Sequence, residues 1–261
     1  MRRISLAAVT APPGPLPSPR TLRIEIAVVL AVTFGLSAYV ALLNLIEAVL
    51  LGLSGQTVAL NQRRSPFDLI DLGLNVASVV QLLAWGALGL YLLWRTGTGP
   101  AQIGLGRFTL HPDLTGGLGL AALIGIPGLA LYVAARVLGL SAAVEPAELN
   151  DTWWRIPLLL MIAFANGWAE EIIVVAFLIT RLRQLNISAG AALLISALLR
   201  GGYHLYQGYS AGLGNVVMGL VFGYVWMRTG KLWPLIVAHG LIDAVAFVGY
   251  SLAAGELDWL S

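Results

Sequence analysis

Two adjacent glutamates, Glu170 and Glu171, stand inside an apolar run that is long enough to cross a membrane. A charged side chain at the bilayer centre costs about 2.5–3.5 kcal/mol on insertion scales, so carboxylates there serve a purpose. Two of the three histidines, His204 and His239, fall in later apolar segments, and Asp243 follows His239 at i+4 on the same helix face. Side chains of these types can take a proton from water, relay protons or bind a metal ion. The alternative is a buried structural pair, hydrogen-bonded to neighbouring helices.

The composition places the chain in a membrane. Of its 261 residues, 58% are hydrophobic and only 11% are charged, and the mean hydropathy is +0.84. Soluble domains carry about 25% charged residues, so the chain is predicted to be a polytopic membrane protein. The sequence has no cysteine, which excludes disulfides, thiolate metal sites and a cysteine nucleophile.

We expect an all-α transmembrane helix bundle of about seven spans (seven to eight) that encloses a polar intramembrane cavity. The predicted spans are 23–53, 69–94, 114–140, 154–180, 189–206, 212–227 and 232–253. Most of them match the length of about 20 residues that a helix needs to cross a hydrocarbon core of about 30 Å. Residues 1–22 are rich in proline and are predicted to be a disordered cytoplasmic tail, whereas residues 23–253 form a single transmembrane domain.

The basic residues are divided unevenly between the two sides of the predicted bundle. One side has Arg2, Arg3, Arg20, Arg23, Arg95, Arg107, Arg181, Arg183, Arg228 and Lys231, and the other has Arg63, Arg64, Arg136 and Arg155. Since Lys and Arg concentrate on the cytoplasmic side, this bias predicts a cytoplasmic N-terminus and a C-terminus outside. The excess of Arg over Lys, with abundant Ala and Gly, is typical of a GC-rich bacterial genome. We therefore expect the inner membrane of a bacterium.

Distances along the predicted helices indicate how deep the polar side chains lie. At 1.5 Å per residue, Glu170, His239 and Asp243 fall near the middle of the bilayer. His204 is expected nearer the outer side unless its helix is tilted, and Tyr203 is expected at the outer interface.

The ordered set of Glu170-Glu171, His204 and His239-Gly-Leu-Ile-Asp243 resembles the CPBP family of intramembrane proteases. That family includes the CAAX prenyl endopeptidases and bacterial proteins linked to bacteriocin processing and self-immunity. The similar region covers about residues 103–248, with weaker matches at Ile103-Gly-Leu-Gly-Arg107 and Gly219-Leu-Val-Phe-Gly223.

The resemblance implies hydrolysis of a peptide bond without an acyl-enzyme, in a protein or peptide substrate within the lipid bilayer. Glu170 would be the general base that activates water, and His204 would help to hold that water. His239 and Asp243 would polarise the scissile carbonyl or stabilise the oxyanion. Because adjacent residues do not share a helix face, one glutamate should point into the cavity and Glu171 elsewhere.

A metal ion is the second possibility that the resemblance raises, because the family is commonly described as metalloproteases. Two histidines and a carboxylate can bind Zn²⁺ or another divalent metal at an open site, and Glu170, His204 and His239 would be the ligands here. The chain has no His-Glu-x-x-His motif, so metal-dependent and glutamate-dependent hydrolysis both remain open.

The sequence departs from the family pattern at two positions. The family motifs read Glu-Glu-x-x-x-Arg and Phe-x-x-x-His, but Val175 stands at the Arg position and Arg200 at the Phe position. We infer that the guanidinium has moved to the next helix, where Arg200 reaches Glu171 and supports the site. The alternative is that Arg200 extends to an interface and that the site is degenerate.

Two other classes of function compete with the protease. A non-proteolytic membrane partner or immunity-type scaffold would keep the pocket without turnover, and the missing arginine at Val175 favours it. A small transporter would use the acidic and histidine side chains as a proton relay. Transporters favour inverted repeats, and the chain has no convincing internal repeat.

Overall fold

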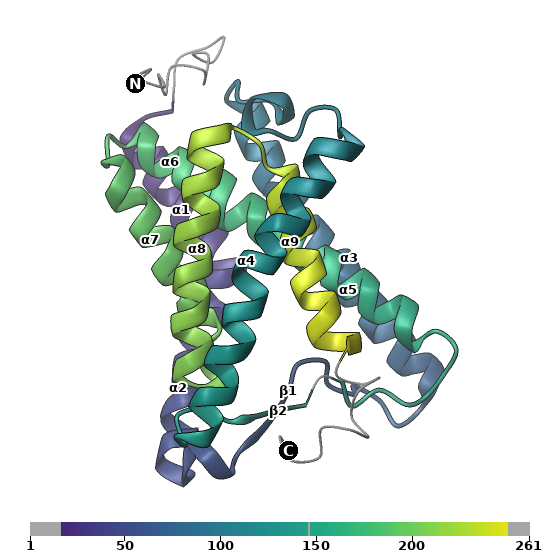
Figure 1. The fold of residues 1–261 in the computed structure, drawn as a ribbon. Helices are drawn as coiled ribbons and strands as arrows, with labels where there is room; N and C mark the ends of the chain where they lie inside the picture. Colours follow the sequence, from purple (N-terminus) through teal and green to yellow (C-terminus); the bar gives the residue numbers. More distant parts are fainter. Residues whose placement is uncertain (1–16, 146, 250–261) are drawn as a thin grey trace.

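The computed structural model describes residues 17–145 and 147–249, which form a bundle of helices (Figure 1). The helices are α1 (Pro19–Val32), α2 (Phe34–Leu51), α3 (Asp68–Arg95), α4 (Leu110–Val137), α5 (Arg155–Glu170), α6 (Leu178–Gln184), α7 (Ala189–Tyr203), α8 (Tyr209–Thr229) and α9 (Trp233–Ala244). A π-helical stretch, Glu171–Phe177, joins α5 to α6, and a second one, Val245–Gly249, continues α9. The predicted all-α bundle is confirmed.

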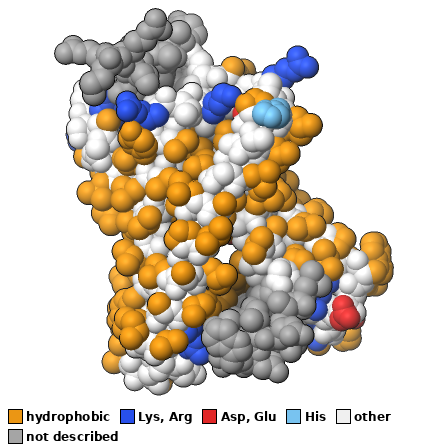
Figure 2. Space-filling view, in the orientation of Figure 1, with side chains coloured by type: hydrophobic (Ala, Val, Ile, Leu, Met, Phe, Trp, Pro, Cys, Tyr) orange, Lys and Arg blue, Asp and Glu red, His pale blue; other side chains and the backbone are white. Residues whose placement is uncertain are grey.

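The lengths and the surface of these helices are those of an integral membrane protein. Within the described residues, five helical segments are long and apolar enough to cross a membrane: Phe34–Leu51, Asp68–Arg95, Leu110–Val137, Arg155–Gln184 and Tyr209–Thr229. Two further predicted spans are shorter apolar helices, Ala189–Tyr203 and Trp233–Gly249. Hydrophobic side chains cover the middle of the face shown in Figure 2, as expected for helices that face lipid tails.

The first predicted span is not one helix, because the chain breaks at Thr33 between α1 and α2. The Thr33 hydroxyl donates to the carbonyl of Val29 at 2.7 Å, a back-bond that bends helices. At Gly35, an added Cβ would lie 2.7 Å from the Leu30 carbonyl oxygen, so the bend requires a glycine there. Helix α1 begins at Pro19, inside the stretch predicted as tail, while residues 1–16 and 250–261 lie outside the described residues.

Two loops contain a small element that the sequence analysis did not predict. Strands β1 (Thr57–Ala59) and β2 (Ala143–Glu145) pair in parallel. They lie at the end of the bundle opposite to the start of α1 (Figure 1). Just before β2, Ser141 forms an antiparallel bridge to Gly208, four residues after His204. This contact attaches the end of α7 to the β2 loop.

The continuous helix from α5 through α6 is the centre of the bundle. In the segment Arg155–Gln184, 72% of the most apolar stretch of 18 residues is buried, whereas the corresponding share in Leu110–Val137 is 6%. Helix α4 therefore faces lipid along most of its length, whereas the helix that carries the two glutamates is enclosed by its neighbours. Small residues allow this enclosure: at Gly89 of α3, an added Cβ would lie 2.8 Å from the Ile173 side chain.

Arg181, which the sequence places at the cytoplasmic end of its span, is fully buried against the middle of α1. Its Nε donates to Glu25 Oε1 at 2.6 Å, and its two terminal nitrogens donate to Thr96 Oγ1 at 2.9 Å and to the Leu92 carbonyl at 2.7 Å. Buried charges need such partners, because an isolated ion in a low-dielectric interior is strongly unfavourable. The Arg181–Glu25 pair thus holds α1 against α3 and α6.

Replacing Glu25 by alanine should destabilise the protein by about 3–5 kcal/mol, because the Arg181 charge would stay buried without its carboxylate. Thermal unfolding in detergent measures this loss. Glu47→Ala, which removes an exposed glutamate from α2, is the matched control and should change the free energy of unfolding by less than about 0.5 kcal/mol. Equal unfolding temperatures for both variants would contradict a stabilising role of the pair.

Candidate active site

Glu170 ends α5 and Glu171 begins the π-helical stretch, so the backbone changes its winding between the two carboxylates. π-Helical turns are rare and often mark functional sites. Here the turn is supported from α7, because the Ser196 hydroxyl donates to the carbonyl of Val174 at 2.7 Å. Both glutamates are buried, Glu171 completely.

A close helix crossing brings α9 to the glutamates. At Gly167 of α5, an added Cβ would lie 3.0 Å from the Ile236 carbonyl oxygen and 3.1 Å from the Gly240 nitrogen. No larger residue fits at this crossing without moving the backbone of α9. Because Gly240 follows His239 and Gly167 precedes Glu170 by three residues, the crossing places the histidine beside the carboxylates.

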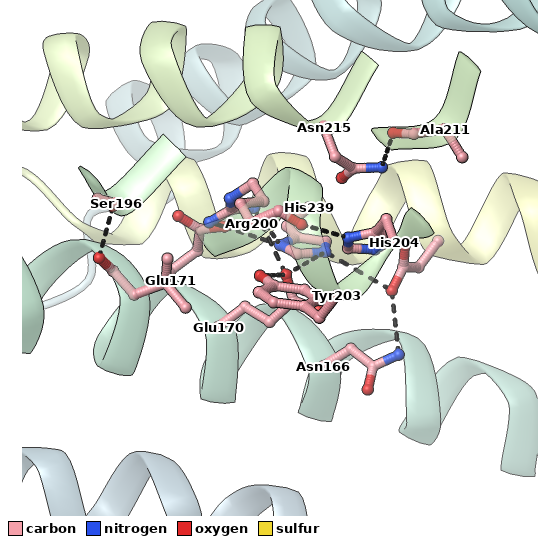
Figure 3. Close-up of polar contacts among 12 residues, drawn as sticks. Asn166, Glu170, Glu171, Ser196, Arg200, Tyr203, His204, Ala211, Asn215 and His239 are labelled. Carbon is pink, nitrogen blue, oxygen red and sulfur yellow. Dashed lines mark hydrogen bonds and ion pairs between the residues drawn. The ribbon is translucent and has the colours of Figure 1, made fainter. Parts of the chain in front are cut away.

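Arg200 of α7 pairs with Glu171, as the sequence analysis inferred. Its Nη2 donates to Glu171 Oε1 at 2.7 Å, and neither side chain is exposed to solvent. The same guanidinium lies 3.6 Å from Glu170 Oε2 through Nη1 and sits over the ring of Phe222. The cation is therefore shared by both glutamates (Figure 3).

His239 lies between the two carboxylates. Its Nδ1 is 2.7 Å from Glu171 Oε1, and because a carboxylate only accepts, the Nδ1–H donates to it. Arg200 Nη1 lies farther from the same nitrogen, at 3.4 Å. Both nitrogens are then donors, so this contact is not a hydrogen bond. On the other edge of the ring, Nε2 lies 3.8 Å from Glu170 Oε2 and 3.8 Å from Asp243 Oδ2. The expectation that only one glutamate faces the site is wrong, since both side chains reach the imidazole.

Tyr203 contacts Glu170 directly and was not predicted to do so. Its buried hydroxyl donates to Glu170 Oε2 at 2.5 Å, and its ring packs against Phe34 and His204. The expected place of Tyr203 at the outer interface is therefore wrong. Its spacing was a signal, because Tyr203 follows Arg200 at i+3 and so lies on the same helix face.

His204 caps the C-terminus of α7, and its ring lies beside those of Tyr203 and His239 (Figure 3). Its Nδ1 is 3.0 Å from the carbonyl oxygen of Arg200, which can only accept, so the Nδ1–H donates to it. The neutral ring then presents Nε2 as an acceptor. His204 lies closer to the glutamates than its expected depth implied, because α7 ends at the site and does not continue past it.

Asn166 is a further contact that the sequence analysis missed. The residue lies on α5 one turn before Glu170, and its Nδ2 donates to Asp243 Oδ2 at 3.2 Å. The i, i+4 spacing of Asn166 and Glu170 would have indicated a common face. Asp243 is the more accessible of the acidic side chains at the site, with 19% of its side chain exposed.

The donor atoms do not fit the predicted metal site. In the part of the chain that the structure describes, no three His, Asp or Glu side chains are placed to hold one metal ion. Glu170 Oε2 already accepts from Tyr203, and the Arg200 guanidinium lies close to both carboxylates. A divalent cation between the glutamates and the histidines would therefore be repelled by a buried positive charge.

The fold and these contacts define an integral membrane protein with a buried acid–base site where α5, α7 and α9 meet. Residues 152–245, just over a third of the chain, match the family model described as Type II CAAX prenyl endopeptidase Rce1-like. This match confirms the resemblance to the CPBP family of intramembrane proteases and supports a membrane-embedded peptidase of the CAAX-protease type. No curated protein and no solved structure matches the chain.

The position of Arg200 can be tested by moving the guanidinium back to α5–α6. Arg200→Phe should cost about 3–5 kcal/mol of stability, because Glu171 would be left buried without its cation. Val175→Arg alone adds a second buried cation and should also destabilise. The double variant should recover much of the loss, because an arginine at position 175 follows Glu171 at i+4. A double-mutant cycle from thermal unfolding in detergent measures the coupling, and strictly additive losses would contradict it.

The Tyr203 hydroxyl should matter for peptidase activity and little for substrate affinity. Tyr203→Phe keeps the ring but removes the donor to Glu170, so kcat should fall about ten- to a hundredfold, since a hydrogen bond to a charged group contributes about 1.5–3 kcal/mol. The matched control is Tyr206→Phe, because the hydroxyl of Tyr206 accepts from the neighbouring Gln207. Equal rates for the two variants would show that the hydroxyl of Tyr203 does not orient Glu170.

Proposed function

We propose that this protein hydrolyses a peptide bond inside the membrane, with a water molecule activated by Glu170 as the nucleophile. One observation carries the proposal: Glu170, His204 and His239 converge from three helices within the segment that matches the protease family model. Ionisable side chains inside a bilayer are costly and rare, and their convergence favours a functional site.

The two oxygens of Glu170 have different tasks. Oε2 is held by the Tyr203 hydroxyl and lies near the Arg200 and His239 nitrogens, whereas none of these contacts uses Oε1. Oε1 is therefore the atom that takes a proton from water. His204 offers Nε2 to the same water, because its Nδ1–H is committed to the Arg200 carbonyl. A positioned general base of this kind contributes about 10²–10⁴ in rate.

The resulting hydroxide attacks the carbonyl carbon of the scissile bond, and negative charge develops on the carbonyl oxygen. In its imidazolium form, His239 keeps its Nδ1–H on Glu171 and turns an Nε2–H toward that oxygen. The C–N bond then breaks, and the proton that Glu170 took from water passes to the leaving amine. Preorganised donors at a developing oxyanion are often the largest contribution to catalysis.

We take this chemistry to be glutamate-dependent, because the donor set does not fit a metal ion. The substrate is a protein or peptide held in the bilayer. A prenylated C-terminal segment is the substrate that the name of the matched family suggests. We also propose a bacterial inner membrane and a cytoplasmic N-terminus, which rest on the distribution and type of the basic residues.

The missing arginine at Val175 no longer favours a non-proteolytic scaffold. Its absence suggested a degenerate site, but Arg200 supplies a guanidinium to the same carboxylate from α7.

Glu170→Gln should abolish peptide cleavage, with a loss of at least about 10³ in rate, because an amide cannot take a proton from water. New peptide termini in membranes that contain the wild-type protein or the variant can be compared by mass spectrometry. Cleavage of a farnesylated CAAX-type peptide in detergent tests the proposed substrate directly. Glu47→Gln is the matched control. Cleavage by the Glu170→Gln variant at the wild-type rate would reject the hydrolase in favour of the scaffold.

A further inference from the structure

On the acidic side of the site, a second hydrogen bond to the oxyanion needs a donor. Asp243 lies 3.8 Å from His239 Nε2, on the same edge of the ring as Glu170 Oε2. An ionised carboxylate accepts hydrogen bonds but cannot donate them, and it repels a developing oxyanion. Arg200 cannot compensate there, because it is fully buried against Glu171.

An amide meets this need. Asn166 projects from α5 toward the side of the site where His204 lies (Figure 3). Its Nδ2 carries two N–H groups, and the contact with Asp243 Oδ2 at 3.2 Å uses one of them. Because Asp243 accepts that hydrogen, it fixes the amide with the nitrogen, and not the carbonyl oxygen, toward the reacting groups.

We propose that Asn166 is a catalytic residue whose second Nδ2–H donates to the oxyanion, with Asp243 holding the amide in place. This inference rests on the proposed function. It assigns Asp243 the positioning of Asn166, and it gives the oxyanion two donors, His239 from α9 and Asn166 from α5. The pair is local to the site, since Asn166 shares a helix face with Glu170 and Asp243 shares one with His239.

A second asparagine near the site provides a matched control. Asn215 of α8 is drawn beside the same group of residues, but its Nδ2 donates to the Ala211 carbonyl of its own helix at 3.0 Å (Figure 3). That amide is therefore turned back on α8. Asn166→Ala and Asn215→Ala remove the same group from two different helices, and only the first should matter for turnover.

The first experiment measures steady-state cleavage of the farnesylated CAAX-type peptide, which should depend on Glu170. Asn166→Ala should lower kcat about 10²–10³-fold, the loss typical of one oxyanion donor, while KM stays within about threefold. Asn215→Ala should leave both constants within about twofold of the wild type. Equal effects of the two variants, or a loss confined to KM, would overturn the proposal.

The second experiment uses a background in which position 243 can donate by itself. In Asp243→Asn, the introduced amide can reach the oxyanion, so adding Asn166→Ala should lower kcat less than about tenfold. A merely structural role of Asn166 predicts the same loss in both backgrounds, and that result would overturn the proposal. The kinetic comparison is made at equal amounts of folded protein, measured by thermal unfolding.

The third experiment separates binding of the oxyanion from turnover. A phosphinate analogue of the same peptide carries a negative oxygen where the oxyanion develops, whereas a reduced-amide analogue does not. Asn166→Ala should weaken phosphinate binding at least about tenfold and leave the reduced-amide affinity unchanged. Equal weakening of both would reject the oxyanion role while leaving the hydrolase intact. If no cleavage depends on Glu170, the proposed function fails first, and the role of Asn166 fails with it.

Discussion

The buried charge of Arg200 is the interaction on which the arrangement of the site depends. Its guanidinium comes from α7, pairs with Glu171 at the start of the π-helical stretch and lies near Glu170. Without it, two carboxylates would be buried side by side, and their repulsion would be strong where water is scarce. The pairing is not complete, because Glu171 Oε2 and Arg200 Nε have no hydrogen-bond partner among the described residues. Removal of either partner should therefore be harmful, as is usual for buried ion pairs.

Each carboxylate of the site accepts hydrogen bonds from different donors, and we infer its task from them. Glu171 is enclosed by Arg200 and the Nδ1–H of His239, so it orients the imidazole and neutralises the guanidinium. Glu170 accepts from Tyr203 at one oxygen, and in the proposed mechanism its other oxygen takes the proton from water. Asp243 is the more exposed acid and accepts from Asn166. In a hydrocarbon environment these hydrogen bonds decide which groups can react, because lipid supplies no competing donors.

Small residues make this concentration of polar groups possible. Gly167 and Gly240 let α5 and α9 approach until the backbone of one helix contacts the other, and α7 ends at the site. At the middle of α1, Arg181 and Glu25 form a second buried ion pair that holds the first helix to the centre of the bundle. The Arg181–Glu25 pair joins helices that are far apart in the sequence, whereas the Arg200–Glu171 pair joins consecutive helices.

The sequence by itself determined the membrane class, the helical fold and the resemblance to the protease family, because hydropathy, span length and the order of the Glu-Glu, His and His-x-x-x-Asp motifs are local properties. It also indicated that Arg200 could replace the arginine missing at Val175, since an unpaired cation at that depth is unfavourable. Only the tertiary structure decided that both glutamates reach His239, that Tyr203 turns inward and that Asn166 meets Asp243. Those contacts depend on the crossing of α5 and α9, the winding of the π-helical turn and the end of α7, which no pattern along a single helix encodes.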